Sequence, residues 1–309
     1  MKQPDDAGRN EPFHSDSSYD IISDIALREH WASDPDSAFY FDRTVESVFE
    51  ATTDGARGYL LDVASGDGSQ LRSFAGNDRV QPVGLELSAP LIERARSTFE
   101  RDGIRAALVR GDAQRLPFDD GTFDRIVCQG SLDHFPAPRA FLAEAARVLA
   151  ADGRLVIALH NYDSASCRIS RAMYAVRGRL GMSRDDPTGS ERPYWQIPEN
   201  HTFRGNLAVL RDLADADLRM ERAFGVSMFW LVPSWRRLLR ALPAKGADML
   251  LHAADRCARR APTLGDMIVS VWTPRRAMRT RRDRAATNGA GAYHELPGQR
   301  SPSRSARIG

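Results

Sequence analysis

Short apolar segments alternate with amphipathic segments through the middle of this 309-residue chain. Five apolar segments have the length and aliphatic character of buried strands: residues 59–63, 83–87, 106–110, 123–129 and 154–160. The segments between them, such as 89–102 and 138–149, space their apolar residues as a helix with one buried face does. Strands buried on both faces and joined by helices form parallel sheets. We therefore predict an α/β protein with a doubly wound, mostly parallel sheet.

The ends of the chain extend this pattern. Further elements are predicted as strands at 219–226 and 266–272 and as helices at 206–214 and 234–260. The sheet would then have seven strands, with a helical insertion, broken near 243–246, before the last one. Helical spacing between residues 19 and 49 predicts two short helices that cap the sheet. The sequence Thr-Thr-Asp-Gly at 52–55 ends that pattern.

Composition narrows the class of protein. With 42% hydrophobic residues, the chain can bury one substantial core. No apolar run reaches the roughly 18–20 residues that span a bilayer, and the N-terminus lacks the apolar core of a secretory signal. We therefore expect a cytoplasmic protein. The three cysteines, Cys128, Cys167 and Cys257, are scattered, and no Cys/His cluster predicts a metal site.

Basic charge is concentrated at the C-terminus. Residues 275–309 hold nine arginines and two acids, whereas the whole chain has a net charge of +2. A basic tail can bind nucleic acid or an anionic membrane. However, only two of the 43 basic residues are lysines, so the arginine bias belongs to the whole chain, and no RNA-binding module accompanies the tail. We expect a solvated, disordered tail over 276–309 and a disordered polar N-terminus over 1–18.

Acidic residues follow three consecutive predicted strands. Asp62 comes just before a glycine-rich turn at 64–68, Glu86 ends the second strand, and Asp112 follows the third. Open α/β sheets bind ligands at these carboxyl ends. A carboxylate repels a pyrophosphate but attracts an ammonium group, and acids also accept hydrogen bonds from a diol or an amino group. Because Leu71 stands where a nicotinamide-dinucleotide fingerprint needs a third glycine, we favour a ligand with an ammonium, a diol and an adenine.

Four stretches between residues 58 and 160 make the prediction specific: LLDVASGDGSQL, PVGLELSAPLIERAR, VRGDAQRLPFDDGTFDRIVCQGSLDHF and AARVLAADGRLVIAL. They resemble the class I S-adenosylmethionine-dependent methyltransferases, and within them the small-molecule, UbiE-like group. The resemblance implies a Rossmann-like fold, S-adenosylmethionine as cofactor and a small-molecule methyl acceptor. It also implies one methyltransferase domain over 19–275, with cap helices over 19–57, a cofactor-binding half over 58–160 and an acceptor-side half over 161–275.

The same resemblance implies which residues hold each part of the cofactor. The methionine end would be bound by Asp62 and by the backbone of Ala64, Gly66 and Gly68, and the ribose would be bound by Glu86. The adenine would be bound at its edge by Asp112 and Ala113 and on its faces by Leu87 and Leu116, and Gln129 would lie at the sulfonium. The chief departure is Ala64, where the family usually has glycine. The contact there is mainly made by the backbone, so we expect cofactor binding to survive the extra methyl group.

The acceptor side of the sequence is less specific. After Gln129 the chain lacks the Asn/Asp-Pro-Pro-Tyr/Phe sequence with which methyltransferases of base and amide nitrogens hold their substrates. We expect O-methylation of a small molecule first, with C- and N-methylation left open. His134 is the candidate general base, with a packing role as the alternative, and His160 and His201 are weaker candidates. The rival reading is a non-catalytic scaffold or sensor that binds the cofactor, which the retained strand-end acids disfavour.

An aromatic and apolar tract occupies residues 226–237 and leads into a leucine-rich helix. One interpretation is a cap helix packed on the sheet. The others are the wall of an apolar or lipid-like acceptor pocket and an element in peripheral contact with a membrane. Nucleic acid is not expected as a partner, and the sequence leaves the oligomeric state open.

Overall fold

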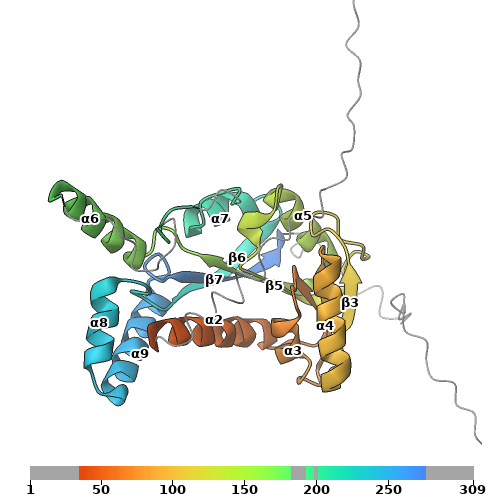
Figure 1. Cartoon of the computed structure of the whole chain (residues 1–309). Helices are drawn as coiled ribbons and strands as arrows, with labels where there is room; N and C mark the ends of the chain where they lie inside the picture. Colours follow the sequence, from red (N-terminus) through yellow and green to blue (C-terminus); the bar gives the residue numbers. More distant parts are fainter. Residues whose placement is uncertain (1–34, 182–192, 198–200, 276–309) are drawn as a thin grey trace, which may run out of the picture.

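The computed structural model describes residues 35–181, 193–197 and 201–275. Within them the chain forms a seven-stranded sheet covered by helices on both faces, the α/β Rossmann-like architecture that the sequence predicts (Figure 1). Both predicted disordered ends, 1–18 and 276–309, lie outside the described residues. The part of the predicted cap before residue 35 lies outside them as well.

The strand order places the first strand in the middle of the sheet. The order is β3-β2-β1-β4-β5-β7-β6, with the bounds β1 (Gly58–Val63), β2 (Val80–Glu86), β3 (Ala107–Arg110), β4 (Phe123–Gln129), β5 (Leu149–His160), β6 (Leu218–Val226) and β7 (Met267–Pro274). Strands β1 to β5 pair in parallel, and β7 pairs antiparallel with β5 and β6. The order reverses between β1 and β4, and open α/β sheets bind ligands at the carboxyl ends of such a pair.

Helices form a layer on each side of the sheet (Figure 1). One layer contains α2 (Pro35–Thr53), α3 (Ser69–Phe74), α4 (Ala89–Asp102) and α9 (Ala244–Arg260), and the other contains α5 (Pro138–Val148) and α7 (Leu207–Ala214). Helix α6 (Ala165–Arg179) projects from the body, α8 (Pro233–Ala241) precedes α9, and the 3-10 helix η1 (Leu132–His134) follows β4. None of the helices in the described ranges is both long and apolar enough to cross a bilayer.

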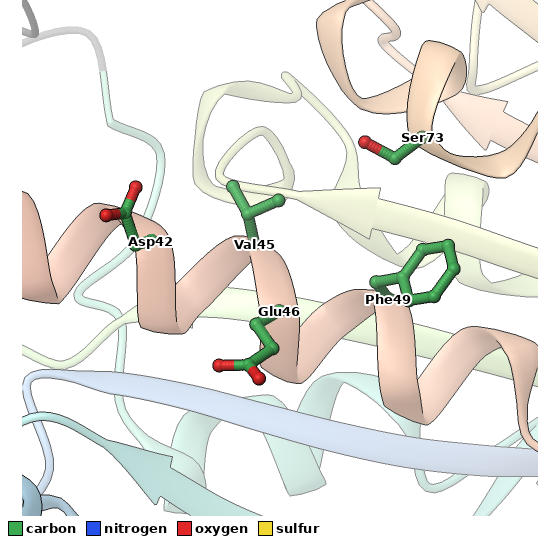
Figure 2. A pocket seen from close by; sticks show the side chains of 5 residues that line it. All are labelled: Asp42, Val45, Glu46, Phe49 and Ser73. Carbon is green, nitrogen blue, oxygen red and sulfur yellow. The ribbon is translucent and has the colours of Figure 1, made fainter.

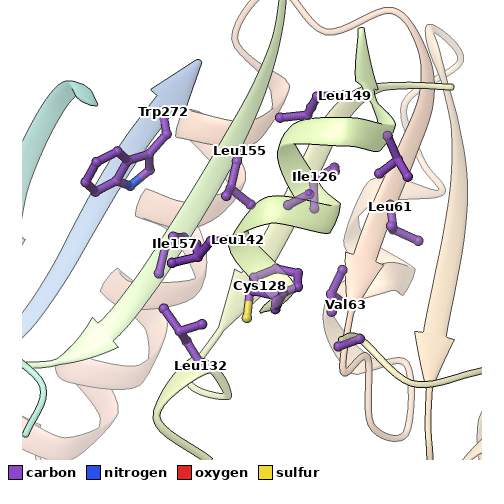
Figure 3. Packing of buried hydrophobic residues seen from close by; sticks show 14 of the residues in the cluster. Leu61, Val63, Ile126, Cys128, Leu132, Leu142, Leu149, Leu155, Ile157 and Trp272 are labelled. Atoms are coloured by element: carbon purple, nitrogen blue, oxygen red, sulfur yellow. The ribbon is translucent and has the colours of Figure 1, made fainter. Parts of the chain in front are cut away.

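Alternating residues of the central strands build a core on each face. Ile126 and Cys128 of β4 pack in the core on the α5 side together with Leu142 (Figure 3). Val127, between them in sequence, belongs to the opposite core with Val48 of α2. Because both faces are buried, most positions of such a strand are apolar, and this is why the strands appear in the sequence as short apolar runs.

The second of the two predicted cap helices is α2, which runs without a break from residue 35 to residue 53. No proline or glycine interrupts that stretch after Pro35. The first predicted helix lies before residue 35 and so outside the described residues. The predicted end is confirmed, since Gly55 takes a φ of +65° in the turn that follows.

Strand β5 begins five residues earlier than the sequence predicts. The Asp-Gly pair at 152–153 lies within β5, because Leu149 already pairs with Phe123 of β4. The register then shifts before Arg125 pairs with Arg154, so the extra residues form a bulge. A bulge depends on the partner strand, which a local sequence pattern does not contain.

A close approach of two backbones near β6 yields a test of the fold. A Cβ on Gly225 would lie 2.7 Å from the carbonyl oxygen of Ala258 in α9. Gly225→Ala should therefore lower the free energy of unfolding by roughly 1–3 kcal/mol, measured by chemical denaturation. Gly246→Ala is the control, since its new Cβ would meet only ordinary contacts at 3.8 Å or more inside α9, and it should stabilise by about 0.5–1 kcal/mol. Equal stability of Gly225→Ala and wild type would contradict this packing.

Candidate active site

The turn after β1 has an unusual backbone conformation. Ala64, Gly66 and Gly68 take positive φ angles of 56°, 58° and 78°. Positive φ at alternate positions occurs where successive backbone N–H groups converge on an anion. At Gly68 the space is also closed, because a Cβ would lie 2.6 Å from the ring of Phe99. At Ala64 the left-handed conformation costs roughly 1–2 kcal/mol in a non-glycine residue, so the departure seen in the sequence is strained but accommodated.

Glu86 fastens this turn to the neighbouring strand. Its carboxylate accepts hydrogen bonds from the backbone N–H of Gly66 and of Ser88, both at 2.9 Å, and its carbonyl oxygen accepts one from Gly111. One acid therefore links the loops that follow β1, β2 and β3. Glu86, which the resemblance implies as the ribose-binding residue, therefore also holds together the loops of the predicted cofactor site.

Asp62 is a buried carboxylate at the end of β1. Its side chain is 3% exposed, and its Oδ2 atom has no hydrogen-bond partner among the described residues. Burial, with a smaller contribution from the charge of Glu86, raises the pKa of Asp62 to about 8. A carboxylate held in this way favours a positively charged ligand, since the ligand would supply the missing hydrogen bonds and offset the loss of hydration. This fits the ammonium group of the methionine end of S-adenosylmethionine.

A second buried oxygen lies at the end of the adjacent strand β4. The Oε1 atom of Gln129 is inaccessible to solvent and has no hydrogen-bond partner in the described part of the chain. Strands β1 and β4 pair directly, with Asp62 opposite Val127, so Gln129 continues the same edge. Polar atoms that are buried without partners are rare in folded proteins, and two at one edge mark a place for a ligand.

The residues that the sequence assigns to the adenine lie at the ends of β2 and β3. Asp112 already accepts two hydrogen bonds, from the backbone and the side chain of Gln114. Leu87 is exposed and Ala113 is buried. Leu116 belongs to the hydrophobic core and is 3% exposed, so its side chain packs inward in this structure. The adenine roles of these residues stay predictions.

The three histidines suggested by the sequence meet at the carboxyl edge, beyond Gln129. The rings of His134 and His201 contact edge to face at 4.3 Å between centroids. His160 contacts Tyr162 in the same way at 4.7 Å, and the hydroxyl of Tyr162 lies 3.3 Å from Nδ1 of His201. Residues from η1, from the end of β5 and from the segment before α7 thus form one cluster.

A buried acid that the sequence reading missed lies at the centre of this cluster. Asp133 places its Oδ2 atom 3.0 Å from Nδ1 of His201, and its Oδ1 atom 4.0 Å from Nε2 of His134. Burial raises the pKa of Asp133, but the hydrogen bond from His201 and the nearby histidines outweigh it and hold that pKa below its usual value. Burial also lowers the pKa of His160 to about 4, so this ring is neutral. The only sequence signal for Asp133 is that it precedes His134.

The same three side chains bear on the prediction of no metal. The ligand atoms of Asp133, His134 and His201 all lie within 4.8 Å of one another. Imidazole nitrogen and carboxylate oxygen are ligands that zinc and related transition metals accept. The cluster therefore has two chemical uses, as a proton acceptor or as a metal site.

The aromatic tract after β6 forms a strained loop beside the histidines. Ser227, Phe229 and Leu231 take positive φ angles of 58°, 69° and 63°. Such conformations cost of order 1–3 kcal/mol each and persist only where the surroundings impose them. Trp230, within this loop, stacks on Tyr40 of α2 at 4.0 Å and contacts His160 edge to face.

Three buried acids from distant elements impose that conformation. Asp255 accepts from the backbone N–H of Ser227, Asp266 from that of Trp230, and Asp36 from that of Leu231. Burial raises the pKa of Asp266 to about 7. The backbone N–H groups of the loop therefore point to these buried acids, while the side chain of Trp230 contacts His160.

An open hollow of about 390 Å³ lies elsewhere, between α2 and α3. It is lined by Asp42, Val45, Glu46, Phe49 and Ser73 (Figure 2). None of these residues is a sequence candidate, and all of them come from the helical layer instead of the strand ends. The hollow is therefore separate from the candidate active site.

Comparison with known proteins gives a family for the central part of the chain. Residues 61–157 match the family model described as "Methyltransferase domain". A probable chloroplastic tocopherol O-methyltransferase of Oryza sativa subsp. japonica is 34% identical over 213 residues, which is 68% of this chain and 55% of that protein. The ubiquinone/menaquinone biosynthesis C-methyltransferase UbiE of Ruegeria sp. (strain TM1040) is 36% identical over 101 residues, 32% of this chain and 40% of that protein. The chain thus spans about half the length of these relatives.

A solved structure agrees on the fold. The PH0226 protein from Pyrococcus horikoshii OT3 superposes with a TM-score of 0.50 at 17% identity, over 80% of this chain and 99% of that one. The matched family, the strand order and the acids at three strand ends point the same way. The chain belongs, through its central domain, to the class I S-adenosylmethionine-dependent methyltransferases.

Proposed function

We propose that this protein is an enzyme that transfers the methyl group of S-adenosylmethionine to an oxygen atom of a small-molecule acceptor. The observation that carries the proposal is the carboxylate of Asp62, which is buried, lacks a partner for Oδ2 among the described residues and lies beside the turn at 64–68. A cationic amine satisfies that carboxylate, and the carboxylate of the same amino acid suits the N–H groups of the turn. The cofactor fits this edge of the sheet.

In this proposal each cofactor contact is made by a residue that the fold holds in place. Asp62 binds the ammonium group and Glu86, whose carboxylate has further lone pairs, accepts from the ribose hydroxyls. Ala113, Leu87 and Leu116, with Asp112, surround the adenine, and Gln129 faces the sulfonium. The bound cofactor supplies an electrophilic methyl carbon. The protein then has to align the acceptor oxygen with that carbon and to receive its proton.

The choice of oxygen as the methylated atom rests on the acceptor side. One of the two relatives is named as an O-methyltransferase and the other as a C-methyltransferase, so these relatives do not decide which atom is methylated. The histidine cluster provides a proton acceptor, which a hydroxyl group requires when it is methylated. The aromatic rings of Tyr162 and Trp230 beside it favour an apolar acceptor. A cytoplasmic location, a solvated tail, the domain boundaries and peripheral contact with a membrane stay predictions.

Ligand binding and turnover separate this proposal from its rivals. Calorimetric titration should give stoichiometric binding of S-adenosylhomocysteine and no binding of NAD. With S-adenosylmethionine and a panel of matched hydroxyl, amine and thiol compounds, mass spectrometry should find a product heavier by one methylene group among the hydroxyl compounds. Binding of S-adenosylhomocysteine without turnover of any compound would favour a cofactor-binding scaffold. Preference for NAD, or binding of neither ligand, would rule out the proposal.

The buried charge of Asp62 can be tested through Asp62→Asn. The variant should bind S-adenosylhomocysteine about 10- to 100-fold more weakly, since a hydrogen bond to a charged group contributes about 1.5–3 kcal/mol. Asp78→Asn, at an exposed position, is the control and should bind like wild type. Unchanged affinity in Asp62→Asn would show that Asp62 does not hold the ammonium group.

The same variant should change how stability depends on pH. Because the pKa of Asp62 is about 8 in the folded protein and near 3.9 when unfolded, the folded state binds more protons between these values. Its contribution to stability is therefore present below pH 4 and is lost as the pH rises towards 8. Without cofactor, Asp62→Asn should melt about 2–4 °C or more above wild type at pH 9 and close to it at pH 4, by calorimetry. If the difference in melting temperature between Asp62→Asn and wild type were the same at pH 4 and at pH 9, the raised pKa of Asp62 would be contradicted.

A further inference from the structure

His201 is fixed at the carboxyl edge although it belongs to the acceptor-side half of the chain. The next residue, Thr202, donates its backbone N–H and its hydroxyl to the carbonyl oxygen of Asp133, at 2.7 and 3.1 Å. Three residues further on, the segment is joined to the exit of β5, because the carbonyl oxygen of Gly205 accepts from the backbone N–H of Tyr162 at 2.9 Å. The segment that follows His201 is therefore held by main-chain contacts to η1 and to the exit of β5.

Asp133 sets the orientation and the tautomer of that ring. The side chains of Asp133 and His201 are only 3% and 7% exposed, and Oδ2 lies 3.0 Å from Nδ1. An ionised carboxylate can only accept, so Nδ1 carries the hydrogen and donates it. The lone pair of His201 is then on Nε2.

We propose that His201, positioned by Asp133, is the general base of the methyl transfer; this deepens the proposed function and rests on it. Nε2 of His201 takes the hydroxyl proton of the acceptor. The oxygen forms its new bond with the methyl carbon while the bond between that carbon and sulfur breaks, and the electron pair of the broken bond stays on sulfur. The products are a methyl ether, S-adenosylhomocysteine and an imidazolium, which returns its proton to water.

The other titratable groups that face His201 are less suited to this role. They are Asp133 and His134 from η1, His160 from the end of β5 and Tyr162 after it. His160 is a weak base, because burial lowers its pKa to about 4. His134, the first candidate from the sequence, has its Nε2 atom 4.0 Å from Oδ1 of Asp133, which is beyond hydrogen-bond length. Asp133 therefore orients His201 and not His134.

A metal ion is the competing use of the same atoms. A transition metal bound to imidazole and carboxylate keeps each ligand atom at about 2.0–2.2 Å. It would coordinate Nδ1 of His201 in place of the hydrogen bond to Asp133, and it would recruit His134 as a third ligand. The hydrogen-bonded pair needs only two of the three residues. The base and the metal site thus predict different effects for a substitution of His134.

The first experiment compares two probe acceptors in His201→Ala and Asp133→Asn. Phenol holds its proton at pH 8, whereas 4-nitrophenol has largely lost it. With phenol both variants should be slower by about 10²- to 10⁴-fold in kcat, as expected when a general base is lost. With 4-nitrophenol the loss should be less than about tenfold, because the base has no proton to take. An equal loss with both probes would overturn the proposal, since it would indicate a structural role.

A split between kcat and KM and a matched control complete the kinetic test. In Asp133→Asn the loss with phenol should fall on kcat, while KM for S-adenosylmethionine stays within about twofold of wild type, because Asp133 acts only through His201. His252→Ala, which removes a histidine paired with Asp248 on the exposed side of α9, should match wild type with both probes. A rise in that KM that matches the fall in kcat would count against Asp133 as the positioning residue.

Two measurements without turnover keep the inference separate from the proposed function. Proton NMR of wild type should show a downfield Nδ1–H signal that disappears in His201→Ala and in Asp133→Asn but remains in His252→Ala, even where no probe is methylated. Absence of this signal in wild type would overturn the pairing. Calorimetric titration with Zn²⁺ should give no stoichiometric binding. Tight binding that is lost equally in Asp133→Asn, His134→Ala and His201→Ala would establish the metal site instead.

Discussion

The parallel pairing of β1 to β5 is the constraint on which the rest of the molecule depends. Every parallel strand enters the sheet at one edge and leaves it at the other, so five chain exits gather at the carboxyl edge. Both faces of these strands are buried under helices, which leaves the edge as the place where backbone and polar side chains can meet a ligand. Because the faces are covered, the acids at the strand ends and the histidine cluster both lie at this edge.

The cofactor half of the edge is stabilised by its surroundings and not by its own contacts. Within the part of the chain that the structure describes, Asp62 and Gln129 keep buried oxygen atoms without partners, and Ala64 adopts a left-handed conformation. Each of these features lowers the stability of the protein without ligand. The two apolar cores and the hydrogen bonds of Glu86 offset that cost. The buried carboxylate of Asp62 is therefore complementary to a ligand that brings an ammonium group.

Local sequence information was sufficient for most of the fold, whereas the cofactor roles of the strand-end acids stay predictions. Apolar runs located the strands, and Asp62, Glu86 and Asp112 followed from reading what comes after each strand. The pairing of Asp133 with His201 could not be read in this way, because it joins residues 68 positions apart in sequence. For the same reason the bulge that starts β5 was missed. In each case the decisive contact comes from an element that is distant in sequence.

The acceptor half is built almost entirely from such distant contacts. The loop that presents Trp230 depends on Asp36 of α2, Asp255 of α9 and Asp266 just before β7. Its three positive φ angles are conformations that residues other than glycine rarely adopt, and the acids hold the loop from outside. The cap helix and the insertion therefore shape the proposed acceptor side, while the central strands shape the proposed cofactor site. This division allows the acceptor side to change in sequence without disturbing Asp62 or Glu86, and it explains why the sequence identifies the cofactor more readily than the acceptor.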